Sequence, residues 1–144
     1  IILERIAARH AMTARQKEIQ ILVEADKELP QIKVDVERIA QVFDNLIINA
    51  FRYTPMGGRI TLAAGENTQG VFIKVQDTGN GIDPQDLPHI FDRFYRGDKA
   101  RQPGGESGLG LSIARSIIEA HKGSLTVESA LDKGTTFLVQ FVKS

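Results

Sequence analysis

The feature that most limits the possible folds is a stretch of about thirty residues, 78–107, without sustained helical or strand periodicity. Only residues 84–89, PQDLPH, have the pattern of a short helix. Seven of the thirteen glycines fall between positions 77 and 110. Connections longer than about 15 residues are uncommon inside compact domains and are usually lids over a functional site or disordered segments. Because residues 90–98, IFDRFYRGD, are too aromatic for a linker, we predict a lid at about 83–107.

Regular elements are predicted on both sides of this stretch from the spacing of apolar residues. We expect helices at 2–17, 36–53 and 109–121, with Asp35 as the N-cap of the second helix. We expect strands at 18–26, 30–35, 59–65, 71–77, 124–130 and 135–142. The last two strands follow one another directly, which favours an α+β sandwich with helices on one face over a doubly wound sheet.

The composition is typical of one globular domain: 144 residues, of which 42% are hydrophobic and 25% charged. Eighteen basic residues balance eighteen acidic ones, so no net charge favours nucleic acid or an anionic membrane as a partner. The absence of cysteine excludes disulfides and thiolate sites and is compatible with a cytoplasmic location. No apolar run approaches the roughly 20 residues of a membrane span, and no signal peptide opens the sequence. Because the first residues already have a helical pattern, we expect a domain excised from a larger protein.

The glycines of GGESGLGLSIAR, 104–115, precede an apolar helix and suggest a site for phosphate. A dinucleotide fingerprint would need G-x-G-x-x-G directly after a strand, and the preceding RGDKARQP has no strand pattern. A P-loop would need lysine where Leu111 stands. What remains is the close backbone approach that Gly108 and Gly110 allow beside a helix N-terminus, where unpaired N–H groups attract phosphate. A flexible loop that ends at a helix cap is the alternative.

Two further segments strengthen the phosphate hypothesis. DTGNGI, 77–82, follows a predicted strand and places an acid beside two glycines, although this pattern alone would also suit a turn. On the helix at 36–53, Asn45, Asn49 and Arg52 form a polar stripe beside the predicted core stripe of Ile39, Val42, Phe43, Leu46, Ala50 and Tyr53. Asparagine is a mediocre helix former, so two of them one turn apart suggest a function. Their amide oxygens suit Mg²⁺, and a solvated face is the alternative.

These three segments, in this order, resemble the ATP-binding catalytic domain of sensor histidine kinases in the GHKL superfamily. The resemblance covers about residues 19–142, with the motifs QVFDNLIINAFRYTP (the N box), DTGNGI (G1), IFDRFYR (F), SGLGLSIAR (G2) and a closing KGTTF. It implies that residues 1–144 are a single ATP-binding domain of the Bergerat fold. In that two-layer α/β sandwich, three helices cover one face of a mixed, mostly antiparallel sheet of about five strands. It also implies a long ATP lid, with ATP and Mg²⁺ as the ligands.

The resemblance assigns the phosphate side of the site to the long helix and the lid. It implies that Asn49 ligates a Mg²⁺ ion bridging the ATP phosphates and that Asn45 assists. Arg52 is expected to contact phosphate, and Tyr53 to line the pocket. Arg96 is expected to reach the γ-phosphate as charge develops there, which makes Asn45 and Arg96 the predicted catalytic residues.

The resemblance assigns the base to the G1 box. Asp77 is expected to accept a hydrogen bond from the adenine N6 amine, while Gly79 and Gly81 clear space for the base. Guanine presents a carbonyl at that position, so a carboxylate discriminates against it. Thr135 is expected to add a polar contact near the base. Ile82 is also expected to line this nucleotide pocket.

The F and G2 boxes complete the predicted site. Phe91 and Phe94 are expected to anchor the lid. Gly108 and Gly110 are expected to let the lid close and to place backbone N–H groups on phosphate. The remaining predicted nucleotide contacts are Leu109 and Leu111. Glu106 departs from the family pattern, which shifts the predicted last hinge of the lid to Gly105.

One position separates the branches of the superfamily. Where hydrolysing relatives have a glutamate that acts as general base, this chain has Asn45, which cannot accept a proton. The resemblance therefore implies phosphoryl transfer from MgATP to a histidine. None of the chain's own histidines (His10, His89 and His121) lies in the H-[ED]-x-R-T-P pattern of the phosphoacceptor, so each is expected to be structural or solvated.

The phosphoacceptor is therefore expected on a separate helical dimerisation domain that precedes residues 1–17, and this chain alone is expected to turn ATP over poorly. A response regulator is the expected indirect partner, without nucleic-acid or direct membrane contact. The domain is expected in the cytoplasm, whether or not the whole protein is anchored in a membrane. Two alternatives remain open: a GHKL ATPase that acts as a conformational clamp, and a non-catalytic ATP-sensing or interaction module.

Overall fold

The computed structural model describes residues 2–25, 34–92 and 110–142. The strands in these ranges are β1 (Gln20–Ala25), β2 (Arg59–Glu66), β3 (Gly70–Asp77), β4 (Ser124–Ala130) and β5 (Gly134–Val142). The helices are α1 (Ile2–Arg9), α2 (Ala11–Gln16), α3 (Val36–Tyr53) and α4 (Gly110–Ala120), with a short 3-10 helix, η1, at Leu87–His89. None of these helices is both long and apolar enough to span a bilayer.

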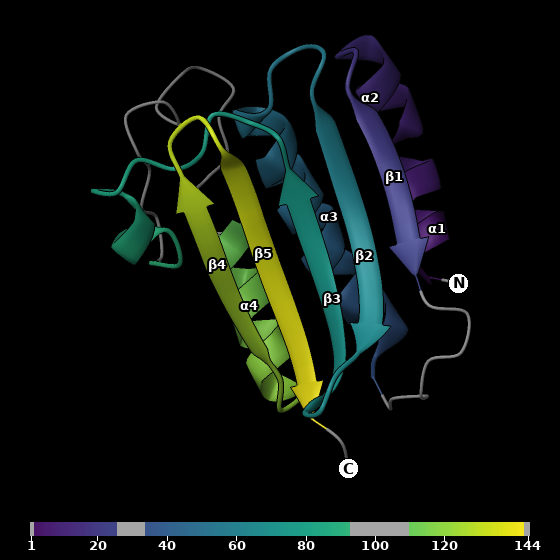
Figure 1. The fold of residues 1–144 in the computed structure, drawn as a ribbon. Helices are drawn as coiled ribbons and strands as arrows, with labels where there is room; N and C mark the ends of the chain where they lie inside the picture. The colour runs from purple at the N-terminus through teal and green to yellow at the C-terminus, as the bar shows by residue number, and fades with distance from the viewer. Residues whose placement is uncertain (1, 26–33, 93–109, 143–144) are drawn as a thin grey trace.

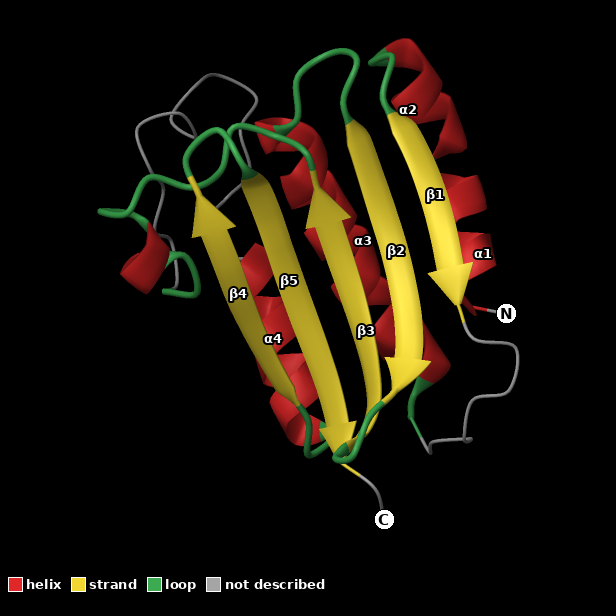
Figure 2. Cartoon of the chain, in the orientation of Figure 1, coloured by secondary structure: helices red, strands yellow, loops and turns green. Residues whose placement is uncertain are grey.

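The strands form one sheet in the order β1-β2-β3-β5-β4. β1 pairs with β2 in parallel, whereas the other three pairs are antiparallel. All four α-helices lie on the same face of this sheet, α3 behind its centre, α4 behind β4 and β5, and α1 and α2 behind the β1 edge (Figures 1 and 2). The predicted two-layer α+β sandwich with a mixed, mostly antiparallel sheet is therefore confirmed.

The core lies between the sheet and α3. The apolar positions of α3 that were predicted to face inward are buried, except that Tyr53 is only half-buried. They meet the inward residues of the central strands, including Val75 on β3 and Phe137 on β5. Asp35 is the N-cap of α3, as predicted, because its carboxylate accepts hydrogen bonds from the N–H groups of Glu37 and Arg38.

Three predicted elements differ from the structure. The helix predicted at 2–17 is broken at His10, whose backbone (φ −102°, ψ 4°) leaves the helical region between α1 and α2. Residues 84–89 form turns and the 3-10 helix η1, because Pro88 lies at its start and cannot continue a hydrogen-bonded α-helix. The strand predicted at 30–35 lies mainly outside the described residues, and its described end is the cap of α3.

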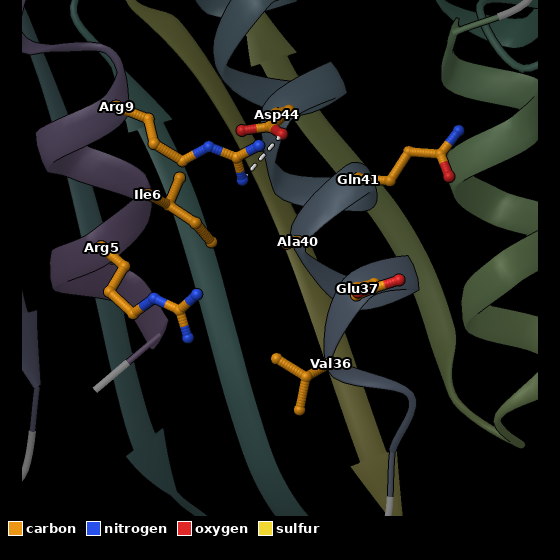
Figure 3. Close-up of a pocket in the computed structure, with 8 residues that line it drawn as sticks. All are labelled: Arg5, Ile6, Arg9, Val36, Glu37, Ala40, Gln41 and Asp44. Atoms are coloured by element: carbon orange, nitrogen blue, oxygen red, sulfur yellow. Dashed lines mark ion pairs between the residues drawn. The ribbon is translucent and has the colours of Figure 1, made fainter.

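Polar contacts attach α1 and the following His10 to α3. The Asp44 carboxylate lies 3.2 Å from an Arg9 guanidinium nitrogen (Figure 3). It also lies 2.8 Å from His10 Nε2. A groove of about 550 Å³ lies between these helices, lined by residues that include Arg5 and Glu37. At the opposite side of α3, the Asp35 N–H donates to Nε2 of His121, which follows the end of α4. These contacts fix both neighbouring helices against α3.

Candidate functional site

A row of polar side chains crosses three strands at one end of the sheet. Asp77 on β3 is paired with Thr135 on β5, and Thr135 is paired with Ser129 on β4. Because side chains two positions apart share a face, all three belong to the helix-facing side, one rung beyond the apolar Val75 and Phe137. Asp77 is only 4% exposed and Thr135 only 2%. We refer to Asp77, Thr135 and Ser129 as the polar row.

The Asp77 carboxylate is held by backbone donors. Its Oδ1 accepts hydrogen bonds from Gly79 N (2.9 Å) and Thr135 N (3.2 Å). Burial raises the pKa of Asp77 above its ordinary value, and the two backbone hydrogen bonds act in the opposite direction. Because both donors use Oδ1, Oδ2 is left to accept a hydrogen bond from a ligand. The site therefore favours a ligand that donates a hydrogen bond to Asp77 Oδ2.

The loop after β3 packs tightly against two other segments. Asn80 N donates to the Tyr53 carbonyl at the end of α3 (2.9 Å), and Asp132 N in the β4–β5 turn donates to the Asn80 carbonyl (2.7 Å). A Cβ added to Gly79 would overlap the Tyr53 carbonyl oxygen, and one added to Gly81 would overlap the carbonyl oxygen of Ala130. Both glycines are thus required by the protein's own backbone, whatever space they also leave for a base.

Gly81→Ala is expected to destabilise the fold by about 2–4 kcal/mol, because Gly81 combines a φ of +79° with the overlap on Ala130. Gly57→Ala is the matched control, since Gly57 has a similar φ of +88° but open space around its Cβ position. It should therefore lose only about 1–2 kcal/mol from the backbone conformation. Urea unfolding of both variants measures the difference, and equal losses would contradict the packing argument.

The polar stripe of α3 begins next to this loop. Asn49 is only 6% exposed, yet its side-chain amide makes no hydrogen bond to any described residue. Among the described residues, Thr54 Oγ1 is the one fully enclosed side-chain polar atom without a partner, so the Asn49 amide reaches the surface and is open to a ligand or to water. Asn45 lies one turn earlier, and its Nδ2 donates to the Gly110 carbonyl at the start of α4 (3.2 Å). This bond connects α3 to the helix that follows the G2-type glycines.

Arg52 and Tyr53 lie together at the C-terminal end of α3. Their side chains are hydrogen-bonded, and Asp86 is close enough to act electrostatically on the Tyr53 hydroxyl. Burial raises the pKa of Tyr53, the nearby Arg52 lowers it, and the charge of Asp86 raises it. The phenol therefore stays protonated at neutral pH and can donate a hydrogen bond.

The predicted site residues on α3 and on the loop after β3 are thus brought together with Thr135. Phe91 packs edge-on against Phe137, with ring centroids 6.2 Å apart, and the Arg115 guanidinium lies 5.0 Å from the Phe91 ring centroid. Gly110 begins α4, and Leu111 packs against the core. The other predicted lid and phosphate contacts lie outside the described residues: Phe94, Arg96, Gly105, Glu106, Gly108 and Leu109.

Three residues with contacts at this site were missed by sequence reasoning: Asp86, Arg115 and Ser129. Ser129 is the best connected, because its hydroxyl accepts a hydrogen bond from Ile82 N (2.7 Å) and lies 2.9 Å from Thr135 Oγ1. A signal was available: along SLTVESA, Leu125 and Val127 alternate as inward residues, and Ser129 continues that alternation as a polar residue.

The residues present suit a hard metal ion held jointly with a ligand. Within the described ranges, no group of three or more His, Asp or Glu side chains could hold a metal ion by itself. A neutral amide oxygen such as that of Asn49 suits Mg²⁺, which keeps most of its other positions for water and phosphate oxygens. The amide of Asn49, which has no partner among the described residues, therefore agrees with a metal ion that arrives with a phosphate ligand.

Comparisons with known proteins agree with this geometry. The sequence model of the family described as histidine kinase-, DNA gyrase B-, and HSP90-like ATPase matches residues 34–144. The sensor protein SrrB of Staphylococcus aureus is 47% identical over 110 residues, which are 76% of this chain and 19% of SrrB. The chain therefore spans about a fifth of the length of the curated relatives that it matches.

Solved structures match nearly the whole chain. The catalytic domain of the histidine kinase ThkA has a TM-score of 0.83 at 28% identity, with 99% of this chain and 92% of that chain covered. ThkA in complex with the response regulator protein TrrA has a TM-score of 0.79 at 26% identity, covering 99% and 40%. Full-length ShkA in complex with AMPPNP has a TM-score of 0.82 at 31% identity, covering 96% of this chain and 28% of that chain.

Proposed function

We propose a reaction for this chain from its family: it belongs to the histidine kinase-, DNA gyrase B- and HSP90-like ATPases and is the ATP-binding catalytic domain of a sensor histidine kinase. In the proposed reaction it donates the γ-phosphoryl group of MgATP to a histidine on a separate helical domain. The single observation that carries this proposal is the pairing of two features: a buried carboxylate with one oxygen left to accept, and an Asn49 amide that has no partner among the described residues and is open to a ligand. The first suits adenine and the second suits the metal-bound phosphates.

The base is assigned to the polar row. The N6 amine of adenine donates to the free oxygen of Asp77, while the other oxygen stays fixed by Gly79 and Thr135. Ile82, which is 2% exposed, supplies an apolar surface beside the base. Guanine would turn a carbonyl toward the carboxylate, and the resulting unpaired acceptors disfavour it by about 1–3 kcal/mol.

The phosphates are assigned to the polar stripe of α3 and the start of α4. Asn49 would hold Mg²⁺, with Asn45 beside it, and the ion would neutralise charge on the phosphate oxygens. Arg52 lies at the end of the same helix and can contact phosphate while it also bonds Tyr53. We assign Arg96 the same role toward the γ-phosphate, on the family resemblance, since it lies outside the described residues.

The type of reaction is assigned from the inability of Asn45 to act as a general base. A neutral amide is no base, and the Asn45 Nδ2 is already occupied by the Gly110 carbonyl. Attack by water or a hydroxyl would need a base at this place, whereas an imidazole is a competent nucleophile without one. This supports transfer to histidine over hydrolysis by a conformational clamp.

The acceptor histidine is proposed to lie outside this chain. His10 is bonded to Asp44, His121 accepts from Asp35, and His89 Nδ1 lies 3.0 Å from Asp92. We therefore propose a preceding helical dimerisation and phosphoacceptor domain, a response regulator as the next acceptor, and a cytoplasmic position for this domain. We also propose that 1–144 is one catalytic domain with its lid at about 83–107.

Phosphorylation in trans tests this proposal. The chain is mixed with a helical hairpin that carries the family's phosphoacceptor histidine and with radiolabelled MgATP. We expect phosphate that is labile in acid and stable in base on the hairpin, and none when its histidine is replaced by alanine. Vigorous release of inorganic phosphate by the chain alone, without transfer, would contradict the kinase assignment and favour the clamp.

A further inference from the structure

We propose, on the basis of the function proposed above, that Ser129 is a positioning residue that sets the base specificity of the site. Its hydroxyl accepts hydrogen bonds from the Thr135 hydroxyl and from the neighbouring Ile82 N–H, so that the polar row presents only acceptors to a ligand. Ser129 lies on the edge strand β4, on a different hairpin arm from Thr135. It is not expected to touch the nucleotide.

The hydrogen-bonding capacity of Ser129 is completely used. Its Oγ lies 2.7 Å from Ile82 N, 2.9 Å from Thr135 Oγ1 and 3.2 Å from the Gly134 carbonyl oxygen. A hydroxyl has one proton to donate and two lone pairs to accept with. The Ile82 N–H can only donate and the Gly134 carbonyl can only accept. The Ser129 proton therefore goes to Gly134, and Thr135 donates its own proton to Ser129.

The opposite orientation leaves a donor without a partner. If Ser129 donated to Thr135, the Thr135 proton would need another acceptor, and Thr135 Oγ1 has no other hydrogen bond within the described residues. Thr135 is only 2% exposed, and no described residue other than Ser129 offers its hydroxyl an acceptor. A buried donor left unpaired is disfavoured by about 1–3 kcal/mol. The orientation in which Thr135 donates to Ser129 satisfies all three contacts.

As a consequence, Asp77 and Thr135 present only hydrogen-bond acceptors to a ligand. The Thr135 N–H is used by Asp77, the Thr135 O–H by Ser129, and the Ile82 N–H by Ser129. What the row can still offer are lone pairs, on Asp77 Oδ2 and on Thr135 Oγ1. Such a surface pairs with the exocyclic amine of adenine and rejects the carbonyl of hypoxanthine or guanine, which needs a donor.

Removing Ser129 should therefore weaken discrimination rather than binding in general. In Ser129→Ala, the Thr135 hydroxyl proton loses its acceptor and can turn toward a ligand carbonyl. We expect the ratio of ATP to ITP affinity, measured by calorimetry with both triphosphates as Mg²⁺ complexes, to fall by about tenfold. A tenfold change in the affinity ratio corresponds to the free energy of about one hydrogen bond gained or lost.

Matched variants separate this role from a structural one. Ser129→Thr keeps the hydroxyl and should keep the ratio within about twofold. The double variant, Ser129→Ala with Thr135→Val, has no hydroxyl proton left to turn. The Ile82 N–H, which also loses its acceptor, is a backbone group fixed toward position 129, so the double variant should restore the preference for ATP. Ser129→Cys, whose larger sulfur is only a weak acceptor and fills the space of the hydroxyl, replaces Ser129→Ala if circular dichroism shows that the alanine variant does not fold.

The outcomes also separate this inference from the proposed function. If Ser129→Ala lowers the affinities for ATP and ITP by the same factor, Ser129 is only structural and the inference is wrong. If the double variant stays unselective, the freed Thr135 proton is not the cause, and the inference is also wrong. A wild-type chain that binds neither triphosphate contradicts the proposed function itself, and the inference with it.

Discussion

Asp77→Asn is expected to lower the affinity for ATP by about a hundredfold or more while leaving the fold intact. The asparagine Oδ1 can still accept from Gly79 N and Thr135 N, so the loop keeps its backbone contacts. The second position then carries an NH₂ group, which faces the adenine amine donor to donor. Losing a charge-assisted hydrogen bond and gaining a donor clash amounts to about 3 kcal/mol or more.

The same substitution is expected to leave the melting temperature at pH 7 unchanged or to raise it. Burial raises the pKa of Asp77, so the folded state holds its proton more tightly than the unfolded chain does. Stability contributed by this group is complete below the unfolded pKa, near 3.8, and is lost as the pH rises through the folded pKa. The stability of the wild type relative to Asp77→Asn should therefore decrease with rising pH across this window.

Calorimetry with ATP and urea unfolding at several pH values measure both parts of this prediction. Asp132→Asn is the matched control, because Asp132 is exposed in the neighbouring β4–β5 turn and undergoes the same chemical change. Its ATP affinity should stay at the wild-type value. Equal ATP affinity for wild type and Asp77→Asn would show that the base does not bind at the polar row.

Most of the fold could be predicted because its elements are encoded locally. The apolar spacing of residues 36–53 and the Asp35 cap define α3 without reference to the rest of the chain. The break at His10 could not be predicted, because its partner Asp44 is 34 positions away and only the packed helices bring them together. The parallel pairing of β1 with β2 is likewise a property of the assembled sheet.

The site was predictable where its chemistry is contiguous in sequence. Asp77 was identified from DTGNGI, and Asn45 and Asn49 from their spacing on one helix. Ser129 was missed because its role depends on two non-local facts: the register of β4 on β5, and the passage of Ile82 over the end of β4. Gly79 and Gly81 were expected to make room for a base, whereas their nearest constraints are carbonyls of α3 and β4.

Substitutions of Asn49 are expected to change the Mg²⁺ dependence of ATP binding in opposite directions. In Asn49→Ala the amide oxygen is removed, so the gain in affinity that Mg²⁺ produces should shrink by about tenfold or more. In Asn49→Asp a carboxylate repels the phosphates when the metal is chelated and attracts the metal when it is present. ATP binding should then be weaker than wild type in EDTA and should recover steeply as Mg²⁺ is added.

The burial of Asn49 makes these effects separable from unfolding. Asn49 is 6% exposed as a residue and its amide lacks a partner among the described residues, so the removal of the amide in Asn49→Ala breaks no hydrogen bond and should not lower stability. Gln41→Ala, an exposed change two turns earlier on α3, should alter neither stability nor Mg²⁺ dependence. Calorimetric titrations with ATP, in Mg²⁺ and in EDTA, compare the four proteins. If both Asn49 variants bind ATP as the wild type does under both conditions, Asn49 is no metal ligand, and the phosphates must lie elsewhere.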